Sequence, residues 1–301
     1  MTEAPRACLV CGSTGPFELT YAIGDYRLVR CRACTLLFQD PPPSPAALAS
    51  AYYEDAAFAD ALMTDLREIT LANARQKVEL LRRSGTLPES GSTVLDVGAS
   101  SGAWLETAAA ERLVGTGVEL GASTAAAARG RGLDVRTGTL ADALPGLGDQ
   151  RFDLITFWDV LEHLPDPRHE LGLARSLLAP GGTIAMTFPN ADGLYPRLTH
   201  RLFARRTGIW EYPELPVHLY DFSPTTARQL LESSGLDVVG MRTFATPYGF
   251  YRSTTLSPDR LGPGWRSRLL RVSFDVTHRV AYPLARLLDR GNSMFVAARI
   301  P

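Results

Sequence analysis

The four cysteines of the sequence form its most specific pattern of metal-ligating residues. Cys8 and Cys11 are separated by two residues, Cys31 and Cys34 are spaced in the same way, and residues 12–30 lie between the pairs. Two such short loops offer four thiolates, which is the donor set of a tetrahedral zinc site. Because the protein would supply all four ligands, we expect this Zn²⁺ to be structural. Two disulfides are the alternative, and the lack of a secretory signal in the N-terminal residues disfavours them.

A second candidate site follows the short apolar stretch 94–97. Asp96 lies within this stretch, and Gly98, Ser100 and Gly102 lie in the small-residue loop after it, before a helical run. A strand, a glycine loop and a helix form the opening of a nucleotide-binding βαβ unit, in which glycines let the backbone approach a ligand. A tight turn without a ligand is the alternative, since the loop lacks the full G-x-G-x-x-G pattern.

Acidic and aromatic residues close two later apolar stretches. Glu119 follows Gly98 by 21 positions, where a nucleotide-binding βαβ unit places a carboxylate for the ribose hydroxyls. Trp158 and Asp159 end a further stretch. Ligands of open α/β sheets bind at the carboxyl ends of the strands, so we expect these residues to lie at one site. A solvent-facing glutamate is the alternative for Glu119.

An alternating series of strands and helices must bring these residues together. The apolar periodicity predicts a parallel, doubly wound α/β sheet. Its strands are expected at residues 94–97, 113–119, 133–138, 152–159, 183–190, 236–244 and 294–300. Helices are expected at about residues 60–83, 103–109, 123–131, 169–178 and 224–233, and in part of the arginine-rich segment 256–291.

Four motifs in this order resemble those of the class I S-adenosylmethionine-dependent methyltransferases. They are VLDVGASSG, GVE, FDLITFWDVLEHLPDP and LLAPGGTIAMTFPN, and the resemblance covers roughly residues 90–245. The N-terminal segment from CLVCGS to AYYED resembles a zinc-binding module joined to methyltransferases of sugars, natural products and glycans. The resemblance implies a Rossmann-like, mostly parallel seven-strand sheet with an antiparallel last strand, and S-adenosylmethionine as the cofactor.

The resemblance also implies roles for the cofactor residues. Asp96, Gly98 and Ser100 would surround the methionine part, with Gly102 completing the loop. Ser101 stands where this family usually has glycine, and its small side chain is compatible with binding.

The remaining cofactor residues follow from the same resemblance. Glu119 would hold the ribose, Thr139 and Leu140 would border the adenine, and Trp158 and Asp159 would lie beside the sulfonium and ribose.

His218 is our candidate for the catalytic base. Residues 217–223 resemble the E-H-L-x-x-F-S segment of zinc-module sugar C-methyltransferases, in which the histidine is the base. Val217 and Leu215 depart from the glutamate and tyrosine of that pattern, and the roughly 55 residues after Phe244 lead us to expect no extra C-terminal domain of the kind those enzymes carry. We therefore expect methylation of oxygen or nitrogen on a small molecule, sugar or natural product, with C-methylation as the alternative. Tyr220 is a second catalytic candidate.

Four tyrosines are candidate pocket aromatics, with core packing as the alternative for each: Tyr52, Tyr53, Tyr220 and Tyr248.

The proline-rich run at residues 40–45 indicates a domain boundary. We expect a zinc ribbon over residues 1–43, a helical linker over 44–88 and a methyltransferase domain over 89–301. An insertion near residues 191–217 combines arginines with aromatic residues, which predicts a substrate lid for an anionic acceptor such as a glycan. A solvated basic helix with a packed aromatic face is the alternative.

The composition limits the possible partners. The net charge is −1, so no global field attracts nucleic acid and we expect no such partner. No apolar run reaches the roughly 18 residues of a membrane span, so we expect no transmembrane segment and a cytoplasmic monomer or homodimer. An RNA methyltransferase and a non-catalytic cofactor-binding scaffold are the alternatives from other classes. An NAD(P) dehydrogenase is disfavoured because the sequence has no catalytic Tyr-x-x-x-Lys pattern. Its only lysine, Lys77, precedes the first strand of the sheet.

Overall fold

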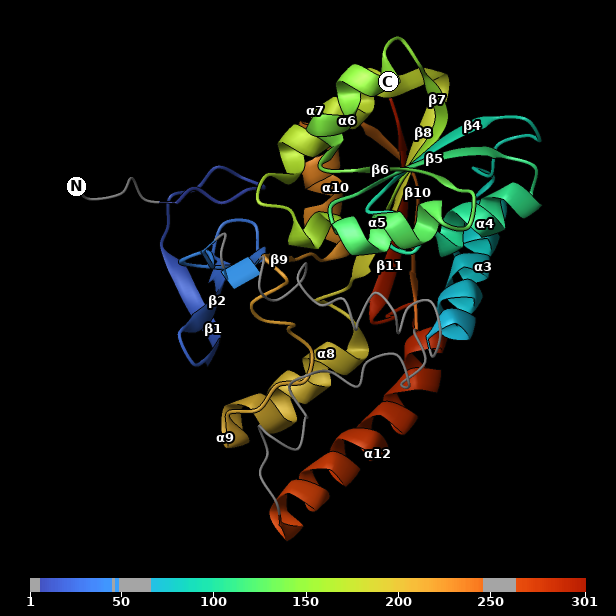
Figure 1. Ribbon diagram of the computed structural model, residues 1–301. Helices are drawn as coiled ribbons and strands as arrows, with labels where there is room; N and C mark the ends of the chain where they lie inside the picture. The colour runs from blue at the N-terminus through green and yellow to red at the C-terminus, as the bar shows by residue number, and fades with distance from the viewer. Residues whose placement is uncertain (1–5, 45–46, 49–65, 246–263) are drawn as a thin grey trace. The chain divides into compact units, whose positions relative to one another are not determined.

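A computed structural model describes residues 6–44, 47–48, 66–245 and 264–301 (Figure 1). The chain forms two compact units. The first, here the ribbon unit, combines Met1–Pro43, Phe188–Leu230 and Met241–Met294, and the second, here the sheet unit, combines Ser44–Thr187, Leu231–Gly240 and Phe295–Pro301. The division at residues 43 and 88 stays a prediction, because both units are assembled from separated segments. Tyr52, Tyr53 and Tyr248 lie outside the described residues.

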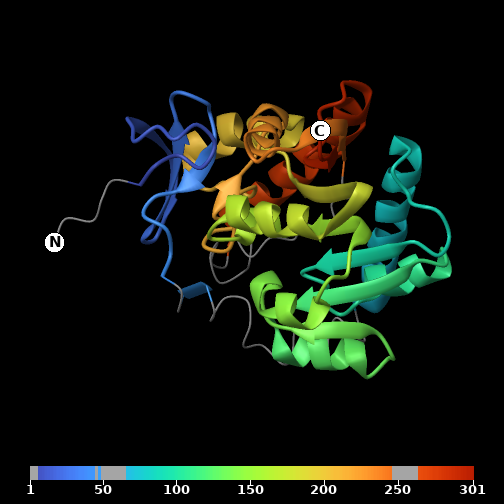
Figure 2. The same cartoon turned by 90° about the horizontal axis from the view of Figure 1, so that it is seen from above.

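The sheet unit is built on a seven-stranded sheet, as predicted. In chain order its strands are β4 (Thr93–Val97), β5 (Val114–Glu119), β6 (Asp134–Thr137), β7 (Phe152–Trp158), β8 (Leu178–Pro189), β10 (Asp237–Phe244) and β11 (Ser293–Arg299). Their order across the sheet is β10-β11-β8-β7-β4-β5-β6. The pairs β4–β5, β4–β7, β5–β6 and β7–β8 are parallel, and Figure 2 shows β4 and β5 side by side.

The strand order places a topological switch point at β4. The chain continues from β4 to β5 on one side, and β7 pairs with β4 on the other side. Loops that leave two such strands in opposite directions open a crevice at their carboxyl ends, where ligands of α/β sheets bind. The strands are buried on both faces, as parallel strands are, and Leu95, Ile155 and Ile184 are fully inaccessible.

The helices of the sheet unit alternate with the strands as predicted, but α6 and the short 3-10 helix were not predicted. They are α3 (Arg67–Ser84), α4 (Ala103–Ala110), α5 (Ala122–Arg129), α6 (Leu140–Leu147), a short 3-10 helix (Leu161–His163) and α7 (Pro167–Leu177). The next helix, α10 (Pro224–Ser233), crosses from the ribbon unit into the sheet unit. Sequence signals set their ends: Gly85 ends α3 in the left-handed conformation, and Asp166 caps α7, with Pro167 at its first position.

The ribbon unit holds a four-stranded sheet in the order β1-β2-β3-β9. Strands β1 (Phe17–Ile23), β2 (Tyr26–Cys31) and β3 (Leu37–Gln39) belong to the cysteine ribbon, and β9 (Tyr220–Asp221) comes from much later in the chain. All neighbouring pairs are antiparallel. The segment that follows His218 therefore completes the sheet of the ribbon.

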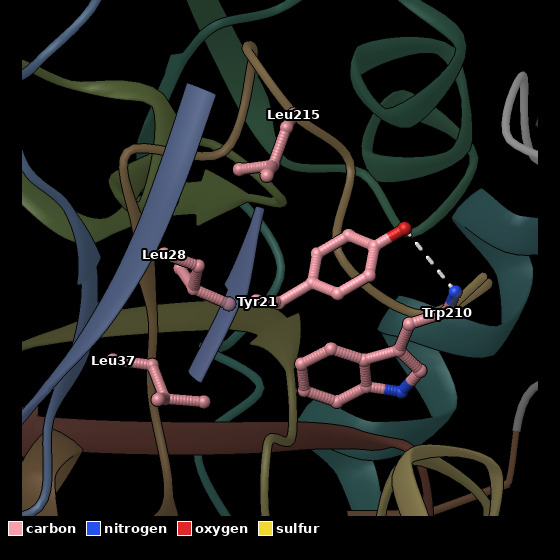
Figure 3. Packing of buried hydrophobic residues seen from close by; sticks show 5 residues of the cluster. All are labelled: Tyr21, Leu28, Leu37, Trp210 and Leu215. Atoms are coloured by element: carbon pink, nitrogen blue, oxygen red, sulfur yellow. Dashed lines mark hydrogen bonds between the residues drawn. The ribbon is translucent and has the colours of Figure 1, made fainter. Parts of the chain in front are cut away.

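The insertion also packs on the ribbon. It forms α8 (Leu194–Thr199), a π-helical turn (His200–Ala204) and α9 (Arg205–Thr207), and α8 contacts the long helix α12 (Trp265–Leu287). A buried cluster joins the two parts, and Figure 3 shows its members, which are Tyr21, Leu28, Leu37, Trp210 and Leu215. The Trp210 amide donates to the Tyr21 hydroxyl at 3.2 Å, and the two rings meet edge to face. None of the helices in the described ranges has the length and apolar character to cross a bilayer.

Candidate functional site

The loop after β4 has an unusual backbone. Gly98 and Gly102 have φ values of +77° and +79°, and Ser100, which is not glycine, has +49°. A Cβ atom at Gly98 would lie 2.5 Å from a methyl group of Val160, and one at Gly102 would collide with the side chain of Leu133. The positive φ angles and these close contacts together favour glycine at both positions. The left-handed Ser100 carries backbone strain, which is typical of ligand-binding loops.

Glu119 ties the loop after β5 to the loop after β4. One carboxylate oxygen accepts the amide N–H of Ser100 at 2.7 Å, and the other accepts the amide N–H of Gly121 at 2.7 Å. Burial raises the pKa of Glu119. A carboxylate has about four acceptor sites, so Glu119 retains capacity for the hydroxyl groups of a ligand.

Asp96 bridges the two central strands. Its side chain is buried and accepts the Thr156 hydroxyl of β7 at 2.7 Å. Burial raises the pKa of Asp96 to about 7. The side chain thus lies at the β4–β7 junction, directly beneath the switch point.

The end of β7 carries Trp158 and Asp159, and Asp159 has a left-handed φ of +58°. Its carboxylate accepts a hydrogen bond from the Thr187 hydroxyl at 3.0 Å. The same carboxylate lies 3.1 Å from the ammonium of Lys77, which belongs to α3. The same ammonium lies 5.5 Å from the centre of the Trp158 ring. The only lysine of the chain therefore contacts both residues at the end of β7. In the sequence analysis Lys77 served only to disfavour an NAD(P) dehydrogenase, and it was not predicted to lie at the site. That it is the only lysine of the sequence was the signal that could have identified it.

Two buried indoles lie next to each other at this end of the sheet. The ring of Trp158 lies 5.6 Å from that of Trp104, in the first turn of α4, and is stacked on Phe295 at 6.4 Å. Neither indole N–H has a hydrogen-bond partner in the described part of the chain. A buried N–H without a partner costs free energy, so these two donors are suited to a polar ligand.

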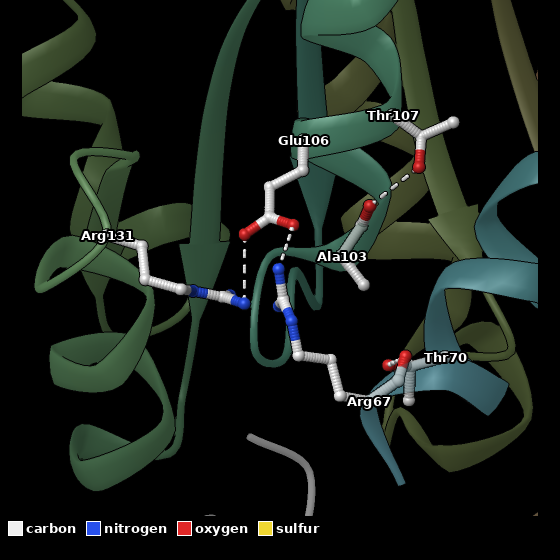
Figure 4. A network of polar contacts seen from close by, with 6 residues as sticks. All are labelled: Arg67, Thr70, Ala103, Glu106, Thr107 and Arg131. Atoms are coloured by element: carbon white, nitrogen blue, oxygen red, sulfur yellow. Dashed lines mark hydrogen bonds and ion pairs between the residues drawn. The ribbon is translucent and has the colours of Figure 1, made fainter. Parts of the chain in front are cut away.

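Helix α4 is held from both sides by ion pairs (Figure 4). The Glu106 carboxylate accepts a hydrogen bond from the guanidinium of Arg67 in α3 at 3.0 Å. Its other oxygen lies 2.9 Å from the guanidinium of Arg131. Arg131 and Glu106 are mostly shielded from solvent, whereas the Arg67 side chain is 35% exposed, so the pair with Arg131 is the less screened of the two. They fix the helix whose first turn carries Trp104.

Thr139 and Leu140 follow β6, as expected, and both have structural contacts. Thr139 caps α6 in a reciprocal capping box with Asp142, and Leu140 is buried in the core. Their cofactor contacts stay a prediction.

The four cysteines of the ribbon unit come together as predicted. The Sγ atoms of Cys8 and Cys34 are 3.5 Å apart, those of Cys11 and Cys31 are 3.6 Å apart, and all four lie within 4.8 Å of one another. All are free thiols. Tetrahedral zinc with Zn–S bonds of about 2.3 Å needs S···S distances of about 3.8 Å. Burial raises the pKa of the Cys8 and Cys34 thiols, whereas burial at Cys31 is outweighed by hydrogen bonds from backbone amides, which lower its pKa. The cluster fits a zinc module.

His218 lies in the ribbon unit between two carboxylates. Its Nε2 is 3.6 Å from Glu214 and its Nδ1 is 3.9 Å from Asp221, and the imidazole is buried. The carbonyl of His218 accepts the side-chain amide of Gln39, at the end of β3, at 2.7 Å. The ribbon thus fixes the loop that carries the imidazole. Sequence reasoning missed both carboxylates, although their i−4 and i+3 spacing was a usable signal.

Tyr220, the second catalytic candidate, belongs to β9. Its side chain is buried and its ring is stacked on that of Phe222. Its hydroxyl accepts a hydrogen bond from the guanidinium of Arg6 at 2.9 Å. These contacts give Tyr220 a packing role in the ribbon unit, and its catalytic role stays a prediction.

Comparison with known proteins agrees with this fold. A family model described as a methyltransferase domain matches residues 68–240. A ubiquinone biosynthesis O-methyltransferase of Pseudomonas paraeruginosa is 34% identical over 111 residues, which are 34% of this chain and 46% of that protein. The chain therefore spans about half the length of the curated relatives it matches.

Solved structures share the fold at low sequence identity. A SAM dependent methyltransferase from Archaeoglobus fulgidus has a TM-score of 0.52 and 21% identity, over 81% of this chain and 99% of that one. A possible histamine N-methyltransferase from Thermotoga maritima has a TM-score of 0.52 and 16% identity, over 82% and 97%.

Proposed function

Since the chain belongs to the methyltransferase-domain family, whose model matches more than half of it, we propose that it methylates an acceptor with S-adenosylmethionine. The observation that carries this proposal is the switch-point geometry. Glu119, the strained Ser100 loop and the Lys77–Asp159 pair all lie at the carboxyl ends of β4, β5 and β7.

The residues present fit this cofactor. Glu119 would accept the ribose hydroxyls while it holds the loop, as a carboxylate with spare acceptor sites can. The indole N–H groups of Trp104 and Trp158 are donors that lack acceptors within the described ranges, and the cofactor offers several acceptors. When bound, it supplies a methyl group on a sulfonium, whose leaving group departs neutral. The protein therefore needs no acid for the leaving group.

We propose His218 as the base that takes the proton of the acceptor. Its support is local: a buried imidazole between the carboxylates of Glu214 and Asp221. Carboxylates in such positions orient an imidazole and stabilise its protonated form. Positioning of the nucleophile supplies up to about 7–11 kcal/mol of the barrier, and a base adds about 10²–10⁴-fold.

We propose oxygen as the first acceptor atom to test, because the relative from Pseudomonas paraeruginosa is an O-methyltransferase. An anionic acceptor is favoured by four exposed arginines of the insertion, which are Arg197, Arg201, Arg205 and Arg206. Paired acceptors that differ only in a carboxylate test this point. A lower KM for the carboxylate form, lost in Arg201→Ala/Arg205→Ala, is expected, and equal KM values would contradict it.

We also propose that the four cysteines hold one structural Zn²⁺. The support is the short mutual distances of the four Sγ atoms, which suit the tetrahedral thiolate set of zinc. Such a metal contributes folding free energy to a ribbon too small to build a core of its own.

Calorimetry with S-adenosylhomocysteine tests the cofactor proposal. We expect binding to the wild-type protein and a loss of at least about tenfold in Glu119→Gln, because the amide presents a donor to the N–H of Ser100 or Gly121. Glu89→Gln, at an exposed position, is the control. Absence of binding would contradict the proposal. Binding without turnover on oxygen and nitrogen acceptors would favour a non-catalytic scaffold.

A further inference from the structure

Helix α12 has two apolar faces on opposite sides. One face is buried within the ribbon unit and carries Phe274, His278, Ala281 and Ala285. The ring of Phe274 lies 4.3 Å from that of Phe203, and the ring of His278 lies 5.2 Å from that of Tyr195. These contacts show that this face packs within the ribbon unit.

The opposite face carries large apolar side chains that are each more than half exposed. They are Trp265, Leu269, Val272, Val276, Val280 and Leu287. Steps of three or four residues, and one of seven, align them along one side of a helix. At about 1.5 Å per residue the stripe is roughly 33 Å long. Soluble monomers rarely expose a continuous apolar surface of this extent, and such a surface indicates an interaction site.

One border of the stripe is rich in arginine, although Asp275 also falls on it, and the other border carries a single arginine. At 3.6 residues per turn, Arg268, Arg279 and Arg286 fall along one border and Arg266 along the other, and all four are exposed. Residues 264–290 contain six arginines and two aspartates, a formal charge of +4. A second copy of α12 would bring these arginines against one another, and like charges at that spacing oppose pairing. The charge instead complements an anionic surface.

We infer that α12 lies on an anionic lipid bilayer, with the stripe at the level of the upper acyl chains and the arginines among the headgroups. An apolar stripe flanked by arginines on a helix that cannot span is the pattern of an interfacial helix. Trp265 begins the stripe, and an amphipathic indole is favoured at the lipid–water boundary. The inference rests on α12 alone and does not require the proposed methyl transfer.

Vesicle binding of the full chain tests the inference. The probes are vesicles of phosphatidylcholine alone and of phosphatidylcholine with phosphatidylglycerol. We expect partition onto the anionic vesicles, weakened by salt, with a blue shift of Trp265 emission that is absent in Trp265→Phe. Val272→Glu/Val276→Glu should lower the partition coefficient by at least about tenfold.

Matched variants separate this effect from a general change in charge or folding. Val114→Glu/Val239→Glu places the same charges at exposed positions of the sheet unit and should leave partition unchanged. Arg268→Glu/Arg279→Glu should remove the preference for anionic vesicles. The inference is overturned if the wild-type protein does not bind anionic vesicles, or if the control variant loses as much binding as the stripe variant. A dimer that Val276→Glu dissociates would also overturn it in favour of self-association.

Discussion

The ammonium of Lys77 lies 3.1 Å from a carboxylate oxygen of Asp159. Partial removal of Asp159 from solvent acts to raise its pKa, but the charge of Lys77 and the Thr187 hydroxyl outweigh this and lower it. Asp159 is therefore ionised at neutral pH in a left-handed backbone conformation at the end of β7. One ion pair thus fixes both the charge and the position of a residue expected beside the cofactor.

Replacement of Lys77 should weaken cofactor binding. Lys77→Met removes the charge and keeps the length of the side chain, so Asp159 loses its partner and we expect affinity for S-adenosylhomocysteine to fall about tenfold. Lys77→Arg should retain most of the affinity. Calorimetry at neutral pH measures both variants. Unchanged affinity in Lys77→Met, with a folded protein, would show that the pair does not position Asp159 for binding.

Removal of His218 should reduce turnover without reducing cofactor binding. We expect His218→Ala to lower kcat by about 10²–10⁴-fold, while the Kd for S-adenosylhomocysteine stays the same. His169→Ala, at an exposed position of α7, is the matched control. Glu214→Gln should also lower kcat, because it removes a carboxylate 3.6 Å from the imidazole. Full kcat in His218→Ala would exclude the histidine as the base.

Metal removal should expose Trp210. The ribbon residues Tyr21, Leu28 and Leu37 pack against this indole, so loss of zinc should loosen the cluster and shift its fluorescence to longer wavelength. Metal analysis should find one zinc per chain, and Cys31→Ser should lower the zinc content.

A control separates this signal from those of the other indoles. In Trp210→Phe, chelation should leave the emission unchanged. A wild-type protein that is folded without bound metal would contradict the zinc site.

Glu211 should make the stability of the protein depend on pH. Burial raises the pKa of Glu211 from 4.5 to about 7, although the Tyr195 hydroxyl donates to it. The folded state therefore holds a proton that the unfolded state releases, so this contribution to stability falls as the pH rises from 4.5 to about 7.

Glu211→Gln should abolish this dependence. We expect the variant to gain up to about 3 kcal/mol over the wild-type protein between about pH 5 and pH 8. Urea unfolding at the two pH values measures the difference, with Glu89→Gln as the control. Parallel stability curves for wild type and Glu211→Gln would refute the prediction.

Much of the sheet unit could be predicted from local patterns. Apolar periodicity and glycine positions predicted the order of the strands and of most helices, since both depend on neighbouring residues. Helix α6 was missed, because Pro145 lies inside it and proline is a helix-breaking signal. Strand β8 begins at Leu178 rather than at residue 183, because an irregular register between Phe152 and Leu154 lets the pairing with β7 start earlier. Glu119 was correctly placed at the end of β5, but its two bonds to backbone amides carry no sequence signature.

Long-range contacts could not be predicted. The pairing of β3 with β9 joins segments with no shared period, and the Lys77–Asp159 pair depends on how α3 packs. The exposed stripe of α12 could not be predicted for another reason. Its apolar residues lie on both sides of the helix, so the sequence shows mixed spacing rather than one amphipathic face.

The pairing of Phe38 with Tyr220 has a consequence for biosynthesis. The four cysteines are translated long before residues 220–221 and have the spacing to bind metal at once. The sheet of the ribbon, however, lacks its fourth strand until residue 221 has been translated. Contacts of such high contact order form late, because a long loop must close first. The ribbon is thus translated before most of the sheet unit but completed only after residue 221, and its unpaired β3 edge is exposed to aggregation during that interval.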